Sequence, residues 1–174
     1  MELWDAYRED GKKAGFDLIR GRKIPDGIYH AVCMIAVRHT DGTYLLTKRH
    51  ERKRAFPGMY ECSAGGSVLK GETVYNAALR ELKEETGITA KALELIDRDV
   101  VKETHVIVYG YVCETDCAKD SVVLQKGETT DYKWVTEEEI YEELEKGDCN
   151  IAHREWLLKY FLQRGKNCET ESDL

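Results

Sequence analysis

Proline is scarce in this sequence, and several features that mark other classes of protein are missing. Only 2 of its 174 residues are proline and 14 are glycine, too few for a low-complexity linker. No apolar run approaches the length of about 18 residues that a membrane-spanning helix needs. Residues 1–5 are acidic and contain no apolar signal segment, so secretion is not expected. We therefore expect a cytoplasmic protein with no membrane contact.

Long basic runs are also missing. The chain has 33 acidic and 26 basic residues and a formal charge of −7, so binding to the backbone of a nucleic acid polymer is not expected. Cys113 and Cys117 have no second close cysteine pair to complete a zinc site, and reduced thiols are the expectation in a cytoplasmic chain. The composition, with 42% hydrophobic and 34% charged residues, is typical of one globular domain with a hydrophobic core.

Turn signals and apolar runs predict a series of strands. Asp10-Gly11 is a turn signal between two short strands in residues 3–19, which predicts an N-terminal β-hairpin. The apolar run at 29–37 predicts a central strand that turns back into a second strand at 44–47. Further strands are expected at 60–64, 92–96 and 105–113. No internal repeat or linker interrupts this series.

The clearest helix is predicted over residues 73–86. Thr73 is a suitable N-cap, and Gly87 follows the last helical position as a left-handed stop residue. Tyr75, Leu79 and Leu82 fall on one side at helical spacing, so we expect them to face the core.

The C-terminal part of the chain changes to a helical period. One helix is expected to open at position 136 and another to cover residues 151–163. The result is a mixed α/β (α+β) domain in which strands and helices do not alternate regularly. We expect a single domain over residues 1–174, with a hairpin extension at 1–28, a core at 29–164 and a flexible tail at 165–174.

Three carboxylates are crowded on the predicted helix 73–86. Glu81, Glu84 and Glu85 stand at i, i+3 and i+4 and therefore share one face. Each like-charged pair costs an isolated helix about 0.2–0.5 kcal/mol, so this arrangement is unexpected in a helix selected for stability alone. The preceding Gly65-Gly66 pair lets backbone carbonyls approach whatever the carboxylates hold. Carboxylate and carbonyl oxygens suit Mg²⁺ bound together with substrate phosphates.

These residues resemble a complete Nudix box. The matching positions are Gly66, Glu72 and the run Arg80-Glu81-Leu82-Lys83-Glu84-Glu85-Thr86-Gly87-Ile88. The resemblance implies the Nudix α/β/α sandwich, with a mixed sheet and here an N-terminal hairpin extension. It also implies a MutT-like pyrophosphatase: a metal-dependent hydrolase that cleaves a diphosphate linkage in a nucleoside diphosphate derivative or related pyrophosphate by attack of water at phosphorus.

The resemblance also implies roles for individual residues. Mg²⁺ or Mn²⁺ would be bound by Glu81, Glu84, Glu85 and the backbone carbonyl of Gly65. Glu85 or Glu84 would in addition be the catalytic group that orients or deprotonates the attacking water. Structural support of the box would come from Gly66, Glu72, Arg80 and Gly87, with Arg80 and Glu72 forming an ion pair that orients the helix and the loop.

Several positions outside the box stay open. The family often adds a metal-binding acid from a loop beyond the helix, for which Glu128 is the candidate and Glu103 and Asp131 are competitors. In the basic segment 49–54, Arg49 and Arg54 are candidates for contact with substrate phosphate. The resemblance implies a small-molecule diphosphate as substrate, and the added hairpin makes a homodimer possible.

Two other functions compete with hydrolysis. The N-terminal part resembles the isopentenyl-diphosphate isomerase branch of the superfamily, which needs a catalytic cysteine and a metal-binding histidine near the box. Those positions hold Gly65 and Ser67, and Cys62 lies three residues too early, on the opposite face of an extended strand. A non-catalytic nucleotide-binding module is the second alternative, which the intact set of carboxylates disfavours.

Overall fold

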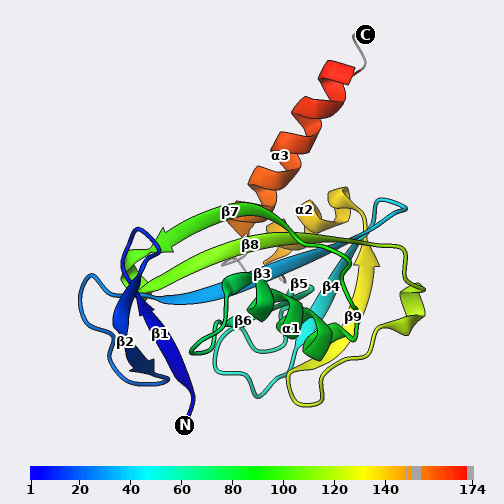
Figure 1. The fold of residues 1–174 in the computed structure, drawn as a ribbon. Helices are drawn as coiled ribbons and strands as arrows, with labels where there is room; N and C mark the ends of the chain where they lie inside the picture. The colour runs from blue at the N-terminus through cyan, green and yellow to red at the C-terminus, as the bar shows by residue number, and fades with distance from the viewer. Residues whose placement is uncertain (148, 150–153, 172–174) are drawn as a thin grey trace.

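The structure is a computed structural model that describes residues 1–147, 149 and 154–171 (Figure 1). The strands are β1 Leu3–Tyr7, β2 Lys13–Ile19, β3 His30–His39, β4 Tyr44–Arg49, β5 Tyr60–Cys62, β6 Ala64–Ser67, β7 Glu94–Val101, β8 Val106–Thr115 and β9 Thr129–Val135. The helices are α1 Val74–Thr86, α2 Glu137–Lys146 and α3 Arg154–Glu171, with short 3₁₀ turns at Lys102–Thr104 and Lys119–Ser121.

The strands form two sheets. β1 and β2 pair as the antiparallel hairpin that the Asp10-Gly11 turn predicts. The other strands form a 7-stranded sheet in the order β5-β4-β3-β8-β7, with β6 paired to β3 and β9 paired to β4. β3 and β8 run parallel while the remaining pairs are antiparallel. The sheet is therefore mixed, as expected.

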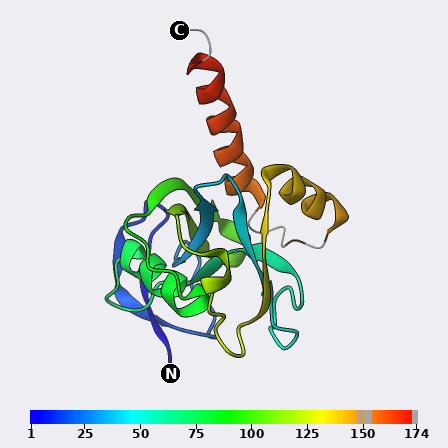
Figure 2. The same ribbon diagram turned by 90° about the vertical axis from the view of Figure 1, so that its right-hand side faces the viewer.

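Helices cover both faces of the central sheet (Figures 1 and 2). Alternate residues of β3 point to opposite sides. Cys33 and Ile35 belong to the core beneath α1, which includes Leu82. Met34 and Ala36 belong to the second core, which is shared with α2 and α3. This layering confirms the α/β/α sandwich.

Some predicted details were wrong. Tyr75 does not face the core: it is 39% exposed, and its hydroxyl accepts a hydrogen bond from the Leu93 amide at 3.3 Å. The buried face of α1 is instead centred on Ala77, Ala78 and Leu82, with Glu85 and Thr86 at its end. The small side chains of the two alanines let α1 pack closely on the sheet, so the buried face is rotated away from Tyr75.

Two element boundaries also differ. β7 begins later than predicted and runs on to Val101, with an irregularity in its pairing between Leu95 and Asp97. α3 begins at Arg154 and continues to Glu171, beyond the predicted end at residue 163 and into the predicted tail. Residues 151–153 of that predicted helix and residues 172–174 of the tail lie outside the described residues. In the part of the chain that the structure describes, no helix has the length and apolar character needed to cross a membrane.

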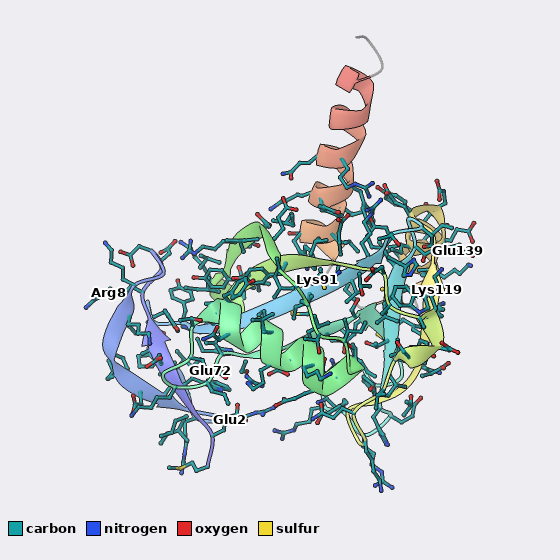
Figure 3. All side chains as sticks on the ribbon, turned by 45° about the vertical axis from the view of Figure 1, so that its right-hand side comes forward. Glu2, Arg8, Glu72, Lys91, Lys119 and Glu139 are labelled. Atoms are coloured by element: carbon teal, nitrogen blue, oxygen red, sulfur yellow. The ribbon has the colours of Figure 1, made fainter. Side chains whose placement is uncertain are left out.

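The N-terminal hairpin packs against the loop that leads into α1. Lys70 and Gly71 donate backbone hydrogen bonds to the Leu3 carbonyl and the Asp5 carboxylate, both at 2.9 Å. The Trp4 ring stacks on His30 of β3, with ring centroids 4.2 Å apart. Figure 3 shows Glu2 of this part of the chain on the same side of the molecule as Glu72, which lies in the loop before α1. The hairpin therefore fixes the loop 68–72 from outside.

Candidate active site

Helix α1 carries the acidic residues of the site and is capped at both ends. The Thr73 hydroxyl accepts a hydrogen bond from the Asn76 amide at 3.1 Å. Gly87 adopts φ 73, and its amide donates to the Lys83 carbonyl at 3.0 Å. This left-handed conformation is unfavourable for residues with a side chain. Both ends of the predicted helix are confirmed, and they set which side chains lie toward β6.

Glu81 lies directly against the backbone of β6. A Cβ atom built on Gly66 would lie 2.2 Å from Glu81 Oε1, so only glycine leaves room for this carboxylate. The Glu81 side chain is 13% exposed, and burial raises its pKa. Glu84, one turn of the helix away, is 45% exposed. The helix thus presents one enclosed carboxylate and one open to solvent.

Glu85 is the most enclosed carboxylate of the three. It is 8% exposed, and the Gly65 amide donates a hydrogen bond to its Oε2 at 2.9 Å. Burial raises the pKa of Glu85 to about 8, and the negative charges of Glu61, Glu81 and Glu128 act in the same direction. A cation beside these groups would offset the electrostatic cost of holding them together.

Arg80 connects the box loop to the acidic face of α1. Its Nε and Nη2 bind both carboxylate oxygens of Glu72 at 2.8 and 3.0 Å. Nη1 donates to Glu81 at 2.7 Å and to Glu84 at 3.3 Å. Nη2 also donates to the Ser67 carbonyl at 3.2 Å. The guanidinium therefore holds loop, strand and helix together, and it supplies positive charge to two of the three carboxylates.

Sequence reasoning missed one acidic residue of the site. Glu61 on β5 is 5% exposed, and its charge contributes to the raised pKa of Glu85. Arg49 Nη1 donates to both oxygens of Glu61 at 2.7 Å, and its Nε donates to the Ala55 carbonyl at 2.9 Å. Arg49 is therefore engaged in an internal ion pair. The burial of Glu61 depends on pairing between β4 and β5, for which the local sequence carries no signal.

The three candidate acids outside the Nudix box, Glu128, Asp131 and Glu103, differ in their contacts. Glu128 forms an ion pair with Lys53, and its charge acts on Glu85. Asp131 instead accepts a hydrogen bond from the Tyr60 hydroxyl at 3.1 Å, and Glu103 is exposed in the 3₁₀ turn after β7. Arg54 is exposed and has no ion pair with any residue that the structure describes.

The donor set suits a hard divalent cation. Glu81, Glu84, Glu85 and the Gly65 carbonyl offer only oxygen atoms, which Mg²⁺ and Mn²⁺ prefer. The close approach of Glu81 to Gly66 and the burial of Glu85 bring these oxygen donors together beside β6. Among the described residues, no three acidic, histidine or cysteine side chains are already arranged for coordination. Glu81 turns toward Arg80 and Glu85 toward the Gly65 amide, so binding would require these side chains to reorient.

The cysteine needed for isomerase chemistry is not presented to this site. Cys62 is 3% exposed in the core shared with α2 and α3, and burial raises the pKa of its thiol well above the ordinary value. The positions nearer the carboxylates are Gly65 and Ser67, both on β6. Cys33, Cys62, Cys113 and Cys117 are free thiols.

Comparison with known proteins agrees with this geometry. The family model described as the NUDIX domain matches residues 29–159. The uncharacterized Nudix hydrolase lmo0368 of Listeria monocytogenes is 34% identical over 147 residues, covering 80% of this chain and 83% of that protein. The NAD-capped RNA hydrolase NUDT12 of Homo sapiens is 31% identical over 145 residues, covering 78% of this chain but only 30% of the human protein.

A solved structure shares the fold. The MutT protein of Methanosarcina mazei superposes with a TM-score of 0.60 at 26% identity, covering 81% of this chain and 95% of that chain. The family match spans β3 to α3 and contains the whole acidic face of α1. From the carboxylates on α1, the glycine pair on β6 and these matches, we conclude that the chain belongs to the Nudix hydrolase family.

Proposed function

We propose that this protein is a pyrophosphohydrolase that cleaves the diphosphate linkage of a nucleoside diphosphate derivative by attack of water at phosphorus. The observation that carries the proposal is the contact of α1 with β6, where Gly66 leaves room for Glu81 and the Gly65 amide holds the buried Glu85. The names of its relatives, a hydrolase of NAD-capped RNA and a MutT protein, support the same class of reaction.

The cofactor in this proposal is Mg²⁺ or Mn²⁺. Glu81, Glu84, Glu85 and the Gly65 carbonyl would hold it, and Glu128 is a further candidate ligand. When bound, such an ion neutralises phosphoryl oxygens and lowers the pKa of a coordinated water. Nudix hydrolases in general use divalent metal ions, and the donor set of this chain is suited to one.

The chain's own residues would orient the reaction. Glu85 is the better candidate for the group that takes a proton from the attacking water, because burial raises its pKa into the range in which a general base works best. Glu84 is the alternative. Arg80 and Glu72 would be positioning residues, since their ion pair ties the loop to the helix. Arg54 remains a candidate for substrate phosphate, whereas the ion pair with Glu61 makes Arg49 a support for Glu61 first.

A substrate screen with two variants tests the proposal. Purified protein with Mg²⁺ or Mn²⁺ should release phosphate, pyrophosphate or a nucleoside monophosphate from at least one member of a panel of dNTPs, NDP-sugars, NADH, ADP-ribose, dinucleoside polyphosphates and prenyl diphosphates. Glu85→Gln and Glu84→Gln should each lower turnover by about 10² or more. Glu138→Gln, an exposed acid of α2, is the matched control and should keep full activity.

The same screen decides between the alternatives. Absence of metal-dependent hydrolysis across the panel, together with nucleotide binding, would identify a non-catalytic binding module. Conversion of isopentenyl diphosphate to its dimethylallyl isomer without release of phosphate would identify an isomerase. A cytoplasmic location, which the free thiols support, and a homodimer built on the hairpin both stay predictions.

A further inference from the structure

A cavity lies on the face of the central sheet opposite α1. Its volume is about 670 Å³, within the range of roughly 300–1,000 Å³ typical of small-molecule sites. Val32 of β3 and Val108 of β8 are paired neighbours on its floor. The residues that alternate with them, Cys33 and Ile107, belong to the core under α1. We call this cavity the sheet cleft.

Met34 and Arg49 connect the sheet cleft with the surroundings of the acidic site. Met34 lines the cleft, and its Cε would lie 2.7 Å from a Cβ built on Gly65, so the Met34 side chain separates the cleft from the Gly65 backbone. Arg49 also lines the cleft and holds Glu61, the buried acid near Glu85. A substrate with its diphosphate at α1 could therefore extend its other group into the cleft.

Two aromatic side chains form walls of the sheet cleft. Trp156 of α3 lies flat on β8, because Gly110 has no side chain: a Cβ there would lie 2.7 Å from Trp156 Cδ2. Trp156 is 4% exposed, and its Nε1 has no hydrogen-bond partner in the described part of the chain. Phe56 lines the cleft from the loop before β5, with φ 50 and 40% exposure. These walls suit a planar ring.

The outer part of the sheet cleft is negatively charged. Asp97 and Asp99 of β7 and Glu155 of α3 all line it. Lys159 forms an ion pair with Asp97 at 2.9 Å, and the charges of Asp99 and Glu155 act on the same lysine. Among the described residues, these three carboxylates therefore have the single ammonium group of Lys159 as their common positive neighbour. A cationic group between aromatic faces and carboxylates is favoured, while a group with its own phosphate is repelled.

We propose, resting on the function proposed above, that the sheet cleft binds the group attached to the substrate's diphosphate and selects a planar heteroaromatic cation over its uncharged form. The aromatic walls provide stacking, and the carboxylates of Asp99 and Glu155 provide the charge that distinguishes the two forms.

NAD⁺ and NADH test this selection, since they differ in the charge of the nicotinamide ring and share the diphosphate and adenosine. We expect kcat/KM for NAD⁺ to exceed that for NADH at least fivefold, mainly through KM. The double variant Asp99→Asn, Glu155→Gln should bring the ratio close to one. The matched control Asp120→Asn, Glu138→Gln removes two exposed acids outside the cleft and should keep the wild-type ratio.

A variant that fills the sheet cleft tests whether the substrate enters it, independently of the charge of the carboxylates. Val108→Phe places a larger side chain on the cleft floor and should raise KM at least tenfold for both dinucleotides. Leu162→Phe, at a position that is 63% exposed on α3, is its control. Equal kcat/KM for NAD⁺ and NADH in the wild type, a preference that survives the double substitution, or an unchanged KM in Val108→Phe would overturn the inference.

If the proposed hydrolase function is wrong, the same experiments give a result that differs from failure of the inference about the cleft. In that case no diphosphate of the panel is hydrolysed, and calorimetric titration with NAD⁺ and NADH decides whether the cleft still distinguishes them. If other diphosphates are hydrolysed but neither dinucleotide binds or reacts, the hydrolase function stands and the inference about the cleft is wrong.

Discussion

Replacing Gly66 by alanine should lower the activity strongly while changing the stability of the fold only slightly. The added Cβ would lie 2.2 Å from Glu81 Oε1 and 2.3 Å from its Cδ, whereas ordinary contacts begin at 3.4 Å. The carboxylate must therefore withdraw by about 1 Å, a displacement that can cost on the order of 10²-fold in rate at a reacting centre. Gly66 does not have a positive φ, and the clash is with the end of a flexible side chain. We thus expect the free energy of unfolding to change by less than about 1 kcal/mol.

Three measurements on purified Gly66→Ala check this expectation: kcat/KM on the best substrate of the panel, the Kd for Mg²⁺ by calorimetry, and urea denaturation. Gly42→Ala is the matched control because Gly42 has φ 93 and open space around it. It should lose about 1–2 kcal/mol of stability through backbone strain and keep its turnover. Wild-type turnover and metal affinity in Gly66→Ala would refute the assigned role of the Glu81 contact.

Three further predictions concern the surroundings of the site. Arg80→Lys should lower kcat/KM about tenfold or more, because an ammonium cannot reproduce the two-pronged contact with Glu72; steady-state kinetics against wild type measures this, and unchanged kinetics would contradict it. Burial lowers the pKa of His30 from 6.5 to about 4, so the unfolded chain binds a proton at this ring more readily than the folded protein does. The contribution of the neutral ring to stability is therefore complete above pH 6.5 and is lost as the pH falls toward 4. Urea denaturation should show wild type losing about 2 kcal/mol more than His30→Phe between pH 7 and pH 5, and parallel losses would exclude this role. Thr136→Ala should remove the capping box of α2 and lower the free energy of unfolding by about 1 kcal/mol with no change in KM; an altered KM would mean that α2 contacts the substrate.

Features that depend on neighbouring residues in the sequence could be predicted. The ends of α1 follow from Thr73 and Gly87, because a side-chain cap and a left-handed glycine act locally. The common face of Glu81, Glu84 and Glu85 follows from helical geometry alone. The hairpin before β3 follows in the same way from its Asp-Gly turn.

Features that depend on distant parts of the chain could not be predicted. Glu61 reaches the site through pairing of β5 with β4. It is paired there with Arg49, which the sequence offered only as a candidate for contact with substrate phosphate. The sheet cleft requires β3, β7, β8, the loop at Phe56 and α3 to meet. Helical periodicity placed Tyr75 in the core because it cannot tell which side of the helix the sheet will cover.

The physical unit that forms the active site is larger than the region that defines the family. The family model begins at residue 29, yet the amides of Lys70 and Gly71 in the box loop are satisfied by Leu3 and Asp5 of the hairpin. A fragment cut at the family boundary would keep every residue of the Nudix box and lose the partners of that loop. For engineering or for grafting this site onto another scaffold, the minimal unit therefore includes the first strand of the chain.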